Sequence, residues 1–295
     1  MSYPIIPMTF IKILSDGKLH SSNELIQQMG IRLIDIHNYI QILKEIGINI
    51  LTIRGQGYCL GFSMHLLDEK IIKSDITGGR LSIIPVIDST NQYLMNSIPK
   101  LQVGDVCIAE HQRSGYGRRS RPWFSSFGSN LYLSIYWRLK NNLVSTTGLS
   151  LIISLAIANV LRKIGASNIK VKWPNDIYLY NRKLAGVLIE LKNQNSKFIE
   201  VVVGIGINLN MHDQSHEIMI KHGGIDLQSI GISVDRNVLS ALVINAIRNV
   251  LTQFEQHALY SYITPKTKIY DEINCLTSLL NEELQYKRDM KQEYI

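Results

Sequence analysis

The chain has 295 residues, of which 45% are hydrophobic and 19% charged, and its formal net charge is +7. This composition excludes a disordered or fibrous chain, and the length favours two or three modules. No apolar run is long enough to span a membrane, and the first nine residues lack the features of a signal peptide, so we expect a cytoplasmic protein without a membrane partner. The three cysteines are far apart, which favours buried thiols over disulfides or a zinc site. The small basic excess allows a polyanionic partner such as nucleic acid.

Residues 1–62 predict a separate small module. Helical patterns cover 9–14, 21–30 and 34–46, and Ser21 stands three residues before Glu24, which is the spacing of a capping box. A hairpin pattern over 48–60 follows, with a glycine-containing turn at 54–57. Three short helices and a hairpin indicate a winged helix-turn-helix.

Residues 63–80 predict a linker with a short helix near 66–70, and residues 81–262 predict a second domain of the α+β class. Short polar turns, such as 181–183, favour antiparallel hairpins and a mixed sheet over regular βαβ units. Strands are expected at 81–87, 106–110, 131–137, 169–172, 176–180, 184–191 and 198–207, and helices at 90–95, 147–164 and 235–260.

The loop over residues 112–123 concentrates unusual chemistry. It holds Gly115 and Gly117, four arginines and Trp123. Glycines let a backbone close over a ligand, and arginine forks pair with phosphate or carboxylate oxygens. On spacing alone, an exposed basic loop or a nucleic-acid-binding patch explains the same residues equally well.

A second cluster combines Lys172 and Asp176 with Lys183, near the ends of adjacent predicted strands. A carboxylate and two lysines placed there can hold a metal-bound nucleotide and neutralise its phosphates. The alternative is a solvated hairpin tip, because the intervening Asn-Arg-Lys is ordinary turn chemistry.

The third stretch, 201–210, places Gly204 and Gly206 in a strand but has Leu209 where a dinucleotide-binding fingerprint needs its third glycine. We therefore read it as a strand that admits a ligand or another backbone closely, with Asn208 available to read a base. Four nearby residues are metal ligands by type but predict only a solvated loop: His212, Asp213, His216 and His222.

Taken in order, the stretches 88–92, 115–123, 172–176, 182–186 and 204–208 resemble the biotin protein ligase family. With the predicted winged helix in front, the chain looks like the bifunctional bacterial form, which also represses the biotin operon. The resemblance covers roughly residues 9–258. It implies a catalytic domain like that of class II aminoacyl-tRNA synthetases, followed by an SH3-like barrel.

The resemblance implies an enzyme, biotin–[acetyl-CoA-carboxylase] ligase. Biotin and MgATP would give biotinyl-5′-AMP, and a lysine of the biotin carboxyl carrier protein would then take the biotin. The implied catalytic groups are Lys183, which would contact the reacting oxygens, Arg118, which would close the loop, Asp176, which would serve Mg²⁺, and Lys172, which would add positive charge.

Each binding site is carried over residue by residue. The implied biotin site consists of Ser89, Thr90, Asn91, Gln112, Gly115, Tyr116, Gly117, Arg118, Lys183, Gly186 and Gly204. The implied nucleotide site consists of Arg118, Arg119, Arg121, Trp123, Asn175, Asp176, Lys183 and Asn208. The implied operator DNA contacts are Ser21, Ser22, Arg32, Asp35, His37, Asn38 and Arg54. A homodimer in the ligand-bound state is also implied.

The sequence departs from the family pattern in the arginine-rich loop, where Tyr116, Ser120 and Pro122 replace the usual Arg, Gly and Lys. Tyr116 removes a cation, so we expect weaker retention of the adenylate. The turn before the third helix, 29–34, is apolar where a polar cap is usual, and no tryptophan follows Trp173, although the family usually packs one on the adenine.

Residues 263–295 are short, polar and helical in pattern, so the C-terminal barrel is expected to be truncated or replaced. This departure keeps a second hypothesis open. The chain would then be a catalytically impaired repressor that senses biotin or biotinyl-AMP. The retained Lys183, Asp176 and Arg118 argue against it, because a sensor needs no cations over reacting atoms.

Overall fold

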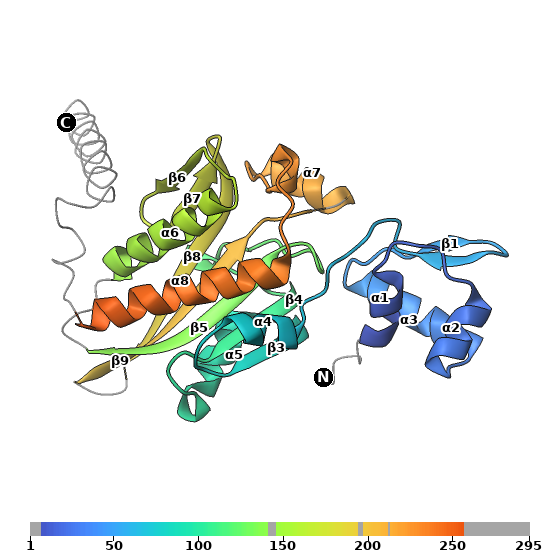
Figure 1. Ribbon diagram of the computed structural model, residues 1–295, viewed down its shortest axis with the longest axis horizontal. Helices are drawn as coiled ribbons and strands as arrows, with labels where there is room; N and C mark the ends of the chain where they lie inside the picture. Colours follow the sequence, from blue (N-terminus) through green and yellow to red (C-terminus); the bar gives the residue numbers. More distant parts are fainter. Residues whose placement is uncertain (1–6, 141–145, 194–196, 212, 257–295) are drawn as a thin grey trace, which may run out of the picture.

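The computed structural model describes residues 7–140, 146–193, 197–211 and 213–256. The predicted C-terminal segment 263–295, Cys275 and His212 lie outside these residues. The N-terminal module contains three helices and a two-stranded antiparallel hairpin, in the predicted order (Figure 1): α1 (Met8–Leu14), α2 (Ser22–Met29), α3 (Leu33–Glu45), β1 (Leu51–Ile53) and β2 (Gly57–Cys59).

Local capping explains where the helices of this module begin and end. The Ser21 side chain accepts a hydrogen bond from the Glu24 N–H at 3.1 Å, as its spacing predicted, and Gly30 ends α2 in a left-handed conformation. The apolar turn before α3 is capped after all, because the Asp35 carboxylate accepts the Arg32 N–H at 2.9 Å. The polar cap that is usual ahead of such a helix is absent, and Asp35 in the first turn of α3 provides the capping contact instead.

The second domain is built on one seven-stranded sheet in the order β3-β4-β5-β9-β8-β7-β6. Only β3 and β4 pair in parallel, and all other neighbours are antiparallel, as predicted. The strands are β3 (Leu81–Ile87), β4 (Val106–Gln112), β5 (Leu131–Lys140), β6 (Ile169–Lys172), β7 (Asp176–Leu179), β8 (Arg182–Asn193) and β9 (Phe198–Ile207).

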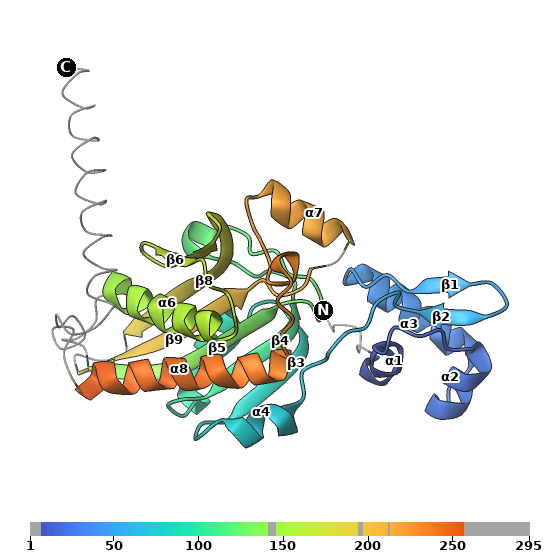
Figure 2. The same cartoon turned by 45° about the horizontal axis from the view of Figure 1, so that its top comes forward.

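Helices cover the two faces of this sheet unequally (Figures 1 and 2). The main core lies between the sheet and three helices: α4 (Glu69–Asp75), α6 (Thr146–Lys163) and α8 (Arg236–Gln256). On the opposite face, α5 (Thr90–Ser97) packs over β4, β5 and β9. Alternation along β9 explains the division, since Val201 and Val203 enter the main core while Val202 faces α5.

The short helix expected in the linker is α4, which begins after Asp68 because the Asp68 side chain caps it and accepts the Lys70 N–H at 2.8 Å. One sequence expectation needs correction. The segment with Asp213, His216 and His222, expected to be a solvated loop, contains helix α7 (Asp213–Lys221). Met219 of α7 is buried, so the helix has an apolar side that its polar composition had obscured.

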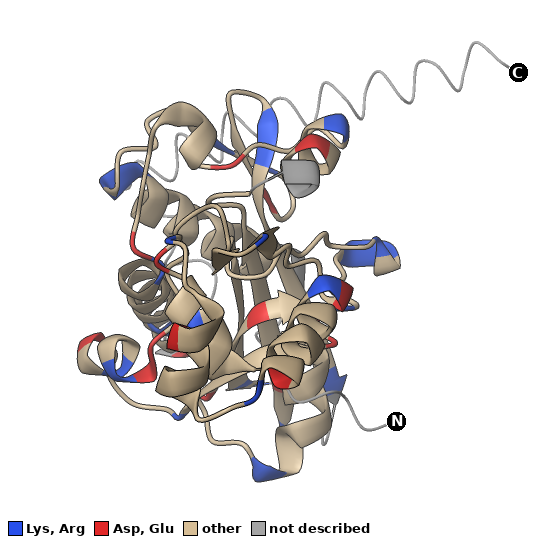
Figure 3. Ribbon diagram, turned by 90° about the vertical axis from the view of Figure 1, so that its right-hand side faces the viewer, with Lys and Arg blue, Asp and Glu red and all other residues tan. Residues whose placement is uncertain are grey.

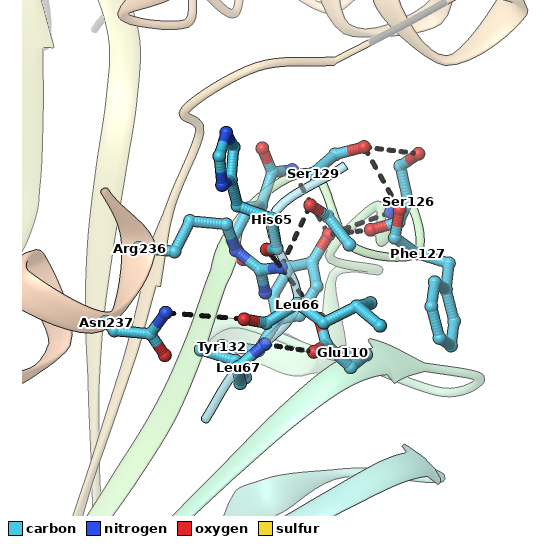
Figure 4. Close-up of polar contacts among 12 residues, drawn as sticks. His65, Leu66, Leu67, Glu110, Ser126, Phe127, Ser129, Tyr132, Arg236 and Asn237 are labelled. Atoms are coloured by element: carbon cyan, nitrogen blue, oxygen red, sulfur yellow. Dashed lines mark hydrogen bonds and ion pairs between the residues drawn. The ribbon is translucent and has the colours of Figure 1, made fainter. Parts of the chain in front are cut away.

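The N-terminal module and the sheet domain share apolar and polar contacts. Phe127, which follows the arginine-rich loop, is buried in the core of the N-terminal module together with Met64. Figure 4 shows polar contacts that hold the segment following this module, where Arg236 donates to Glu110 at 2.7 Å and to the His65 carbonyl at 3.0 Å. Both charged side chains are at most 5% exposed, so the ion pair is sequestered from water.

In the view of Figure 3, segments with lysine or arginine and segments with aspartate or glutamate both occur at several places along the ribbon. In the part of the chain that the structure describes, no helix is both long and apolar enough to cross a membrane.

Candidate functional site

A cavity of about 870 Å³ opens on the sheet face that α5 covers only in part. Its size is within the range of sites for small molecules and cofactors. The residues that line it come from the start of α5, the arginine-rich loop, the β6–β7 turn and strands β8 and β9: Ser89, Thr90, Asn91, Gln112, Tyr116, Gly117, Arg118, Arg119, Arg121, Pro122, Trp123, Lys172, Trp173, Pro174, Asn175, Asp176, Tyr178, Lys183, Gly186, Val187, Leu188, Gly204, Ile205 and Gly206.

Glycines form the floor of the cavity, and neighbouring side chains occupy the space that a side chain at these glycine positions would need. Gly186 pairs with Gly206 across β8 and β9, and Gly204 lies two residues before Gly206, so all three share one face of the sheet. A Cβ on Gly206 would stand 2.5 Å from the Trp123 ring, and one on Gly204 would stand 2.2 Å from Asn91 Oδ1. The glycines thus admit Trp123 and Asn91 against the strands.

The arginine-rich loop forms the roof as a narrow hairpin. The Gly117 N–H donates to the Arg121 carbonyl and the Trp123 N–H to the Gly115 carbonyl, each at 2.8 Å. The tip turns sharply, with Arg119 and Ser120 both at positive φ. Arg118 donates to the Asn175 side chain at 3.3 Å and so reaches the opposite wall.

Cations converge in the middle of the cavity. Lys183 Nζ lies 2.8 Å from an Asp176 carboxylate oxygen and 5.5 Å from the centroid of the Trp123 ring. Lys172 extends over the ring of Tyr178 at 5.1 Å. With the loop arginines, these lysines can neutralise a carboxylate and a phosphate brought together, which is what acyl-adenylate formation requires.

The end of the cavity near α5 is lined by uncharged hydrogen-bonding groups. Gln112 Oε1 accepts from the Thr90 backbone N–H at 2.9 Å and from its hydroxyl at 3.1 Å. Ser134 Oγ lies 2.7 Å from Thr90 Oγ1 and 2.6 Å from Asn91 Oδ1. Hydroxyl and amide groups at such spacing suit a ligand with N–H donors and a carbonyl, such as a cyclic urea.

Beside this polar end, the Tyr116 hydroxyl donates to the Glu190 carboxylate. Its oxygen lies 3.0 Å from one carboxylate oxygen and 3.1 Å from the other. Asn91 Nδ2 donates to the same carboxylate at 2.8 Å. Burial and the Glu190 charge raise the pKa of Tyr116 to about 12, so the hydroxyl keeps its proton at neutral pH. Glu190 was absent from our sequence-based candidates, since no local motif marks it.

The structure brings nearly all the predicted biotin and nucleotide residues to one cavity. Gly115 does not line the cavity but is next to a residue that does, because a Cβ added at Gly115 would stand 2.9 Å from Gln112 Nε2. Asn208 is the exception, because it is buried and its side chain donates to the Ile225 carbonyl at 3.2 Å. Sequence reasoning missed Tyr178 as a lining residue, although its position two residues after Asp176 on β7 puts both on one face.

The candidate metal ligand Asp176 stands without other acidic ligands. Among the described residues, no three His, Cys, Asp or Glu side chains gather in a way that could hold a metal ion. The Asp176 carboxylate already faces Lys183. This donor set fits Mg²⁺ only if phosphate oxygens supply most of the ligands, which is usual for nucleotide-bound Mg²⁺.

The candidate DNA-contact residues lie in the N-terminal module, far from the cavity in sequence. Arg32, His37, Asn38 and Arg54 are exposed. Arg32 forms a two-point contact with Asp35, at 3.1 and 3.2 Å, and the ring of His37 lies 3.4 Å from the Tyr58 hydroxyl. Ser21 is occupied by capping, while Ser22 is half-buried at the start of α2.

Comparison with known proteins identifies the same region. Residues 83–208 match the biotin/lipoate A/B protein ligase family. The chain is 45% identical to the bifunctional ligase/repressor BirA of Salmonella typhimurium, over 90% of this chain and 82% of that protein. It is 44% identical to BirA of Escherichia coli, over 91% of this chain and 84% of that protein.

A solved structure of a biotin protein ligase resembles part of this chain in fold. The biotin protein ligase of Aquifex aeolicus in complex with biotin and ATP superposes with a TM-score of 0.54 at 29% identity, covering 62% of this chain and 75% of that one. The resemblance inferred from the five motifs is therefore confirmed, and the chain belongs to the biotin protein ligase family, among its bifunctional ligase/repressors.

Proposed function

We propose that this chain makes biotinyl-5′-AMP from biotin and ATP, transfers the biotin to a lysine of the biotin carboxyl carrier protein, and represses transcription from a biotin operator. The enzymatic part of the proposal rests on one observation: the same cavity has an uncharged polar end and contains the cations Lys183, Lys172 and Arg118. Relatives named bifunctional ligase/repressor support both activities.

In the first step, a carboxylate oxygen of biotin attacks the α-phosphorus of ATP and pyrophosphate leaves. Two anions must meet, so fixed positive charge lowers the barrier. Lys183 would contact both groups, which is supported by the position of its ammonium in the cavity, 2.8 Å from Asp176 and 5.5 Å from the centroid of the Trp123 ring. Thr90 and Gln112 would hold the ureido ring at the uncharged end, which orients the carboxylate toward the cations.

Mg²⁺ is part of this proposal as a companion of ATP. When bound, it neutralises phosphate charge and orients the leaving pyrophosphate. Asp176 is the protein group proposed to face it, with the phosphates as the other ligands. Its contact with Lys183 at 2.8 Å would keep that carboxylate oriented before the nucleotide arrives.

In the second step, the carrier lysine attacks the carbonyl carbon of the mixed anhydride and AMP leaves. The arginine-rich loop would cover the adenylate until the carrier arrives, and Arg118 would grip its phosphate. Arg118 is exposed and held only by Asn175 at 3.3 Å, so this contact can be exchanged for one with a ligand.

For repression, we propose that residues 1–62 form a winged helix-turn-helix whose helix α3 enters the major groove of operator DNA. One such module reads a single half-site, so a ligand-induced homodimer would supply the second copy. The other proposed units are a linker at 63–80 and a catalytic domain at 81–262. The cytoplasmic location expected from the sequence stays a prediction.

One assay tests the enzymatic part directly. Purified protein is mixed with biotin, ATP labelled at the α-phosphate and an apo carrier domain, and both labelled adenylate and biotinylated carrier are scored. We expect both products, and omission of biotin is the control. Adenylate without carrier transfer would support the alternative, a repressor that senses biotinyl-AMP. Absence of adenylate would contradict the ligase assignment.

A further inference from the structure

Two side-chain hydrogen bonds, one at the tip of the arginine-rich loop and one at its base, connect the loop to other parts of the sheet domain. At its tip, Arg118 contacts Asn175 at 3.3 Å, a long hydrogen bond between exposed groups. At its base, Tyr116 contacts Glu190 of β8 at 3.0 and 3.1 Å. The second contact is half-buried and has a charged acceptor, which makes it the stronger of the two.

Glu190 is a fixed acceptor. Its backbone pairs with Val202 inside the β8–β9 ladder, and its carboxylate accepts from Asn91 at 2.8 Å. Asn91 is itself buried at 4% exposure and held by Ser134 at 2.6 Å. A donor on the loop that reaches Glu190 is therefore bound to the rigid part of the domain.

Tyr116 is also bound within the loop. It forms a bridge with Pro122 across the hairpin, next to the backbone hydrogen bonds of Gly117 and Trp123. A restraint on Tyr116 is thus transmitted to both strands of the hairpin, and through Trp123 to the roof over Gly206.

We infer that Tyr116 is a positioning residue that, through its hydrogen bond to Glu190, holds the arginine-rich loop over the cavity before any ligand binds. This inference rests on the proposed ligase function and extends it. From the sequence we expected the missing cation at this position to weaken retention of the adenylate. The hydroxyl supplies a different restraint, since a neutral donor pairs with a carboxylate that is already in place.

The consequence for binding is a smaller ordering cost. A loop that is closed in the free protein loses less conformational freedom when biotin arrives, so affinity rises without new contacts to the ligand. The effect should therefore fall on the KM for biotin and on loop exchange, and much less on kcat, because Tyr116 does not carry the charge that the reaction requires.

The test is Tyr116→Phe in the full chain, with Tyr180→Phe as a matched control that removes a hydroxyl from an exposed tyrosine. Hydrogen–deuterium exchange of peptides covering 113–124 is measured without ligand. Loss of a hydrogen bond to a charged group should speed exchange of the Gly117 and Trp123 amides roughly tenfold or more. Tyr180→Phe should leave exchange of these amides at the parent rate, and saturating biotin should restore protection in Tyr116→Phe.

Steady-state adenylate formation provides the second readout. For Tyr116→Phe we expect the KM for biotin to rise roughly tenfold while kcat stays within about a factor of two of the parent. Glu190→Gln should shift both readouts in the same direction. If the two side chains act as a pair, amide exchange and the KM for biotin in the double variant should be no higher than in Tyr116→Phe alone.

Unchanged exchange in Tyr116→Phe, or additive effects in the double variant, would overturn the inference. A fall in kcat with unchanged KM would also contradict it, because it would place Tyr116 in the chemical step. Exchange requires no catalysis, so a parent protein that made no adenylate would refute the proposed function while the exchange data still decided the role of Tyr116.

Discussion

Two arginine-bearing regions of this chain use the same chemistry for opposite purposes. In the loop at 112–123, Arg118, Arg119 and Arg121 are exposed at the rim of the cavity. At the start of α8, Arg236 is 5% exposed and donates to Glu110 and to three backbone carbonyls, those of His65, Gly128 and Asn130.

The difference lies in how many partners each guanidinium has within the protein. Arg236 is saturated on two of its three nitrogens and therefore joins segments far apart in sequence. Among the loop arginines, Arg118 donates only one long hydrogen bond among the described residues, to Asn175 at 3.3 Å, so these exposed guanidiniums can bind an anion that the protein itself does not provide. Composition alone cannot separate the two roles, whereas burial and partner geometry can.

The largest expected effect is at the centre of the cavity. Lys183→Ala should slow adenylate formation by roughly 10²–10³-fold, because it removes a fixed cation from the reacting groups. Rapid-quench measurement of labelled biotinyl-AMP gives the rate. The far-ultraviolet circular dichroism should match the parent, since the Lys183 side chain is partly exposed and lines the cavity. Formation of adenylate at the parent rate would show that Lys183 has been assigned the wrong role.

The second effect concerns the buried arginine. Arg236→Met leaves Glu110 charged and buried, and should lower the free energy of unfolding by about 3–5 kcal/mol in urea titrations. The matched control is Arg121→Ser on the exposed loop, which should change stability by less than about 0.5 kcal/mol. Similar losses for the two variants would end the distinction between a structural and a ligand-binding arginine.

A smaller effect is expected at the loop tip. Arg118→Gly should leave the free energy of unfolding unchanged but release the adenylate roughly tenfold faster, because a charge-assisted contact is lost. A chase with unlabelled biotin and ATP measures release, and labelling of unrelated lysines by free adenylate gives an independent readout. Parent-like retention would place the grip on the adenylate elsewhere in the loop.

The smallest expected effect is a change in the oligomeric state of the protein when ligand binds. If contacts of the loop arginines with the ligand are coupled to assembly while the Arg236 contacts stay as they are, biotin plus MgATP should shift the protein from monomer toward homodimer. Sedimentation velocity at micromolar protein tests this. Operator binding should follow the same concentration dependence and weaken steeply with salt. An identical sedimentation coefficient with and without ligand would contradict ligand-coupled dimerisation.

Sequence reasoning predicted the strands, the loop and the Lys183–Asp176 cluster because these depend on local alternation, turn chemistry and compact motifs. It could not predict the pairing of Tyr116 with Glu190, since 74 positions separate them and only sheet register brings them together. The helix α7 was missed for a related reason. Its polar residues suggested a loop, and only the contact of the buried Met219 reveals which face packs.

Phe127 has a consequence for how far the two domains can be treated as independent parts. It follows the cavity-lining Trp123 by four residues, yet it is 4% exposed within the N-terminal core. A shortened chain that began after residue 62 would leave the aromatic ring and its neighbour Met64 facing water, directly beside the roof of the active cavity. Engineering a free-standing ligase from this sequence therefore calls for a polar replacement of Phe127 as well as a new start site.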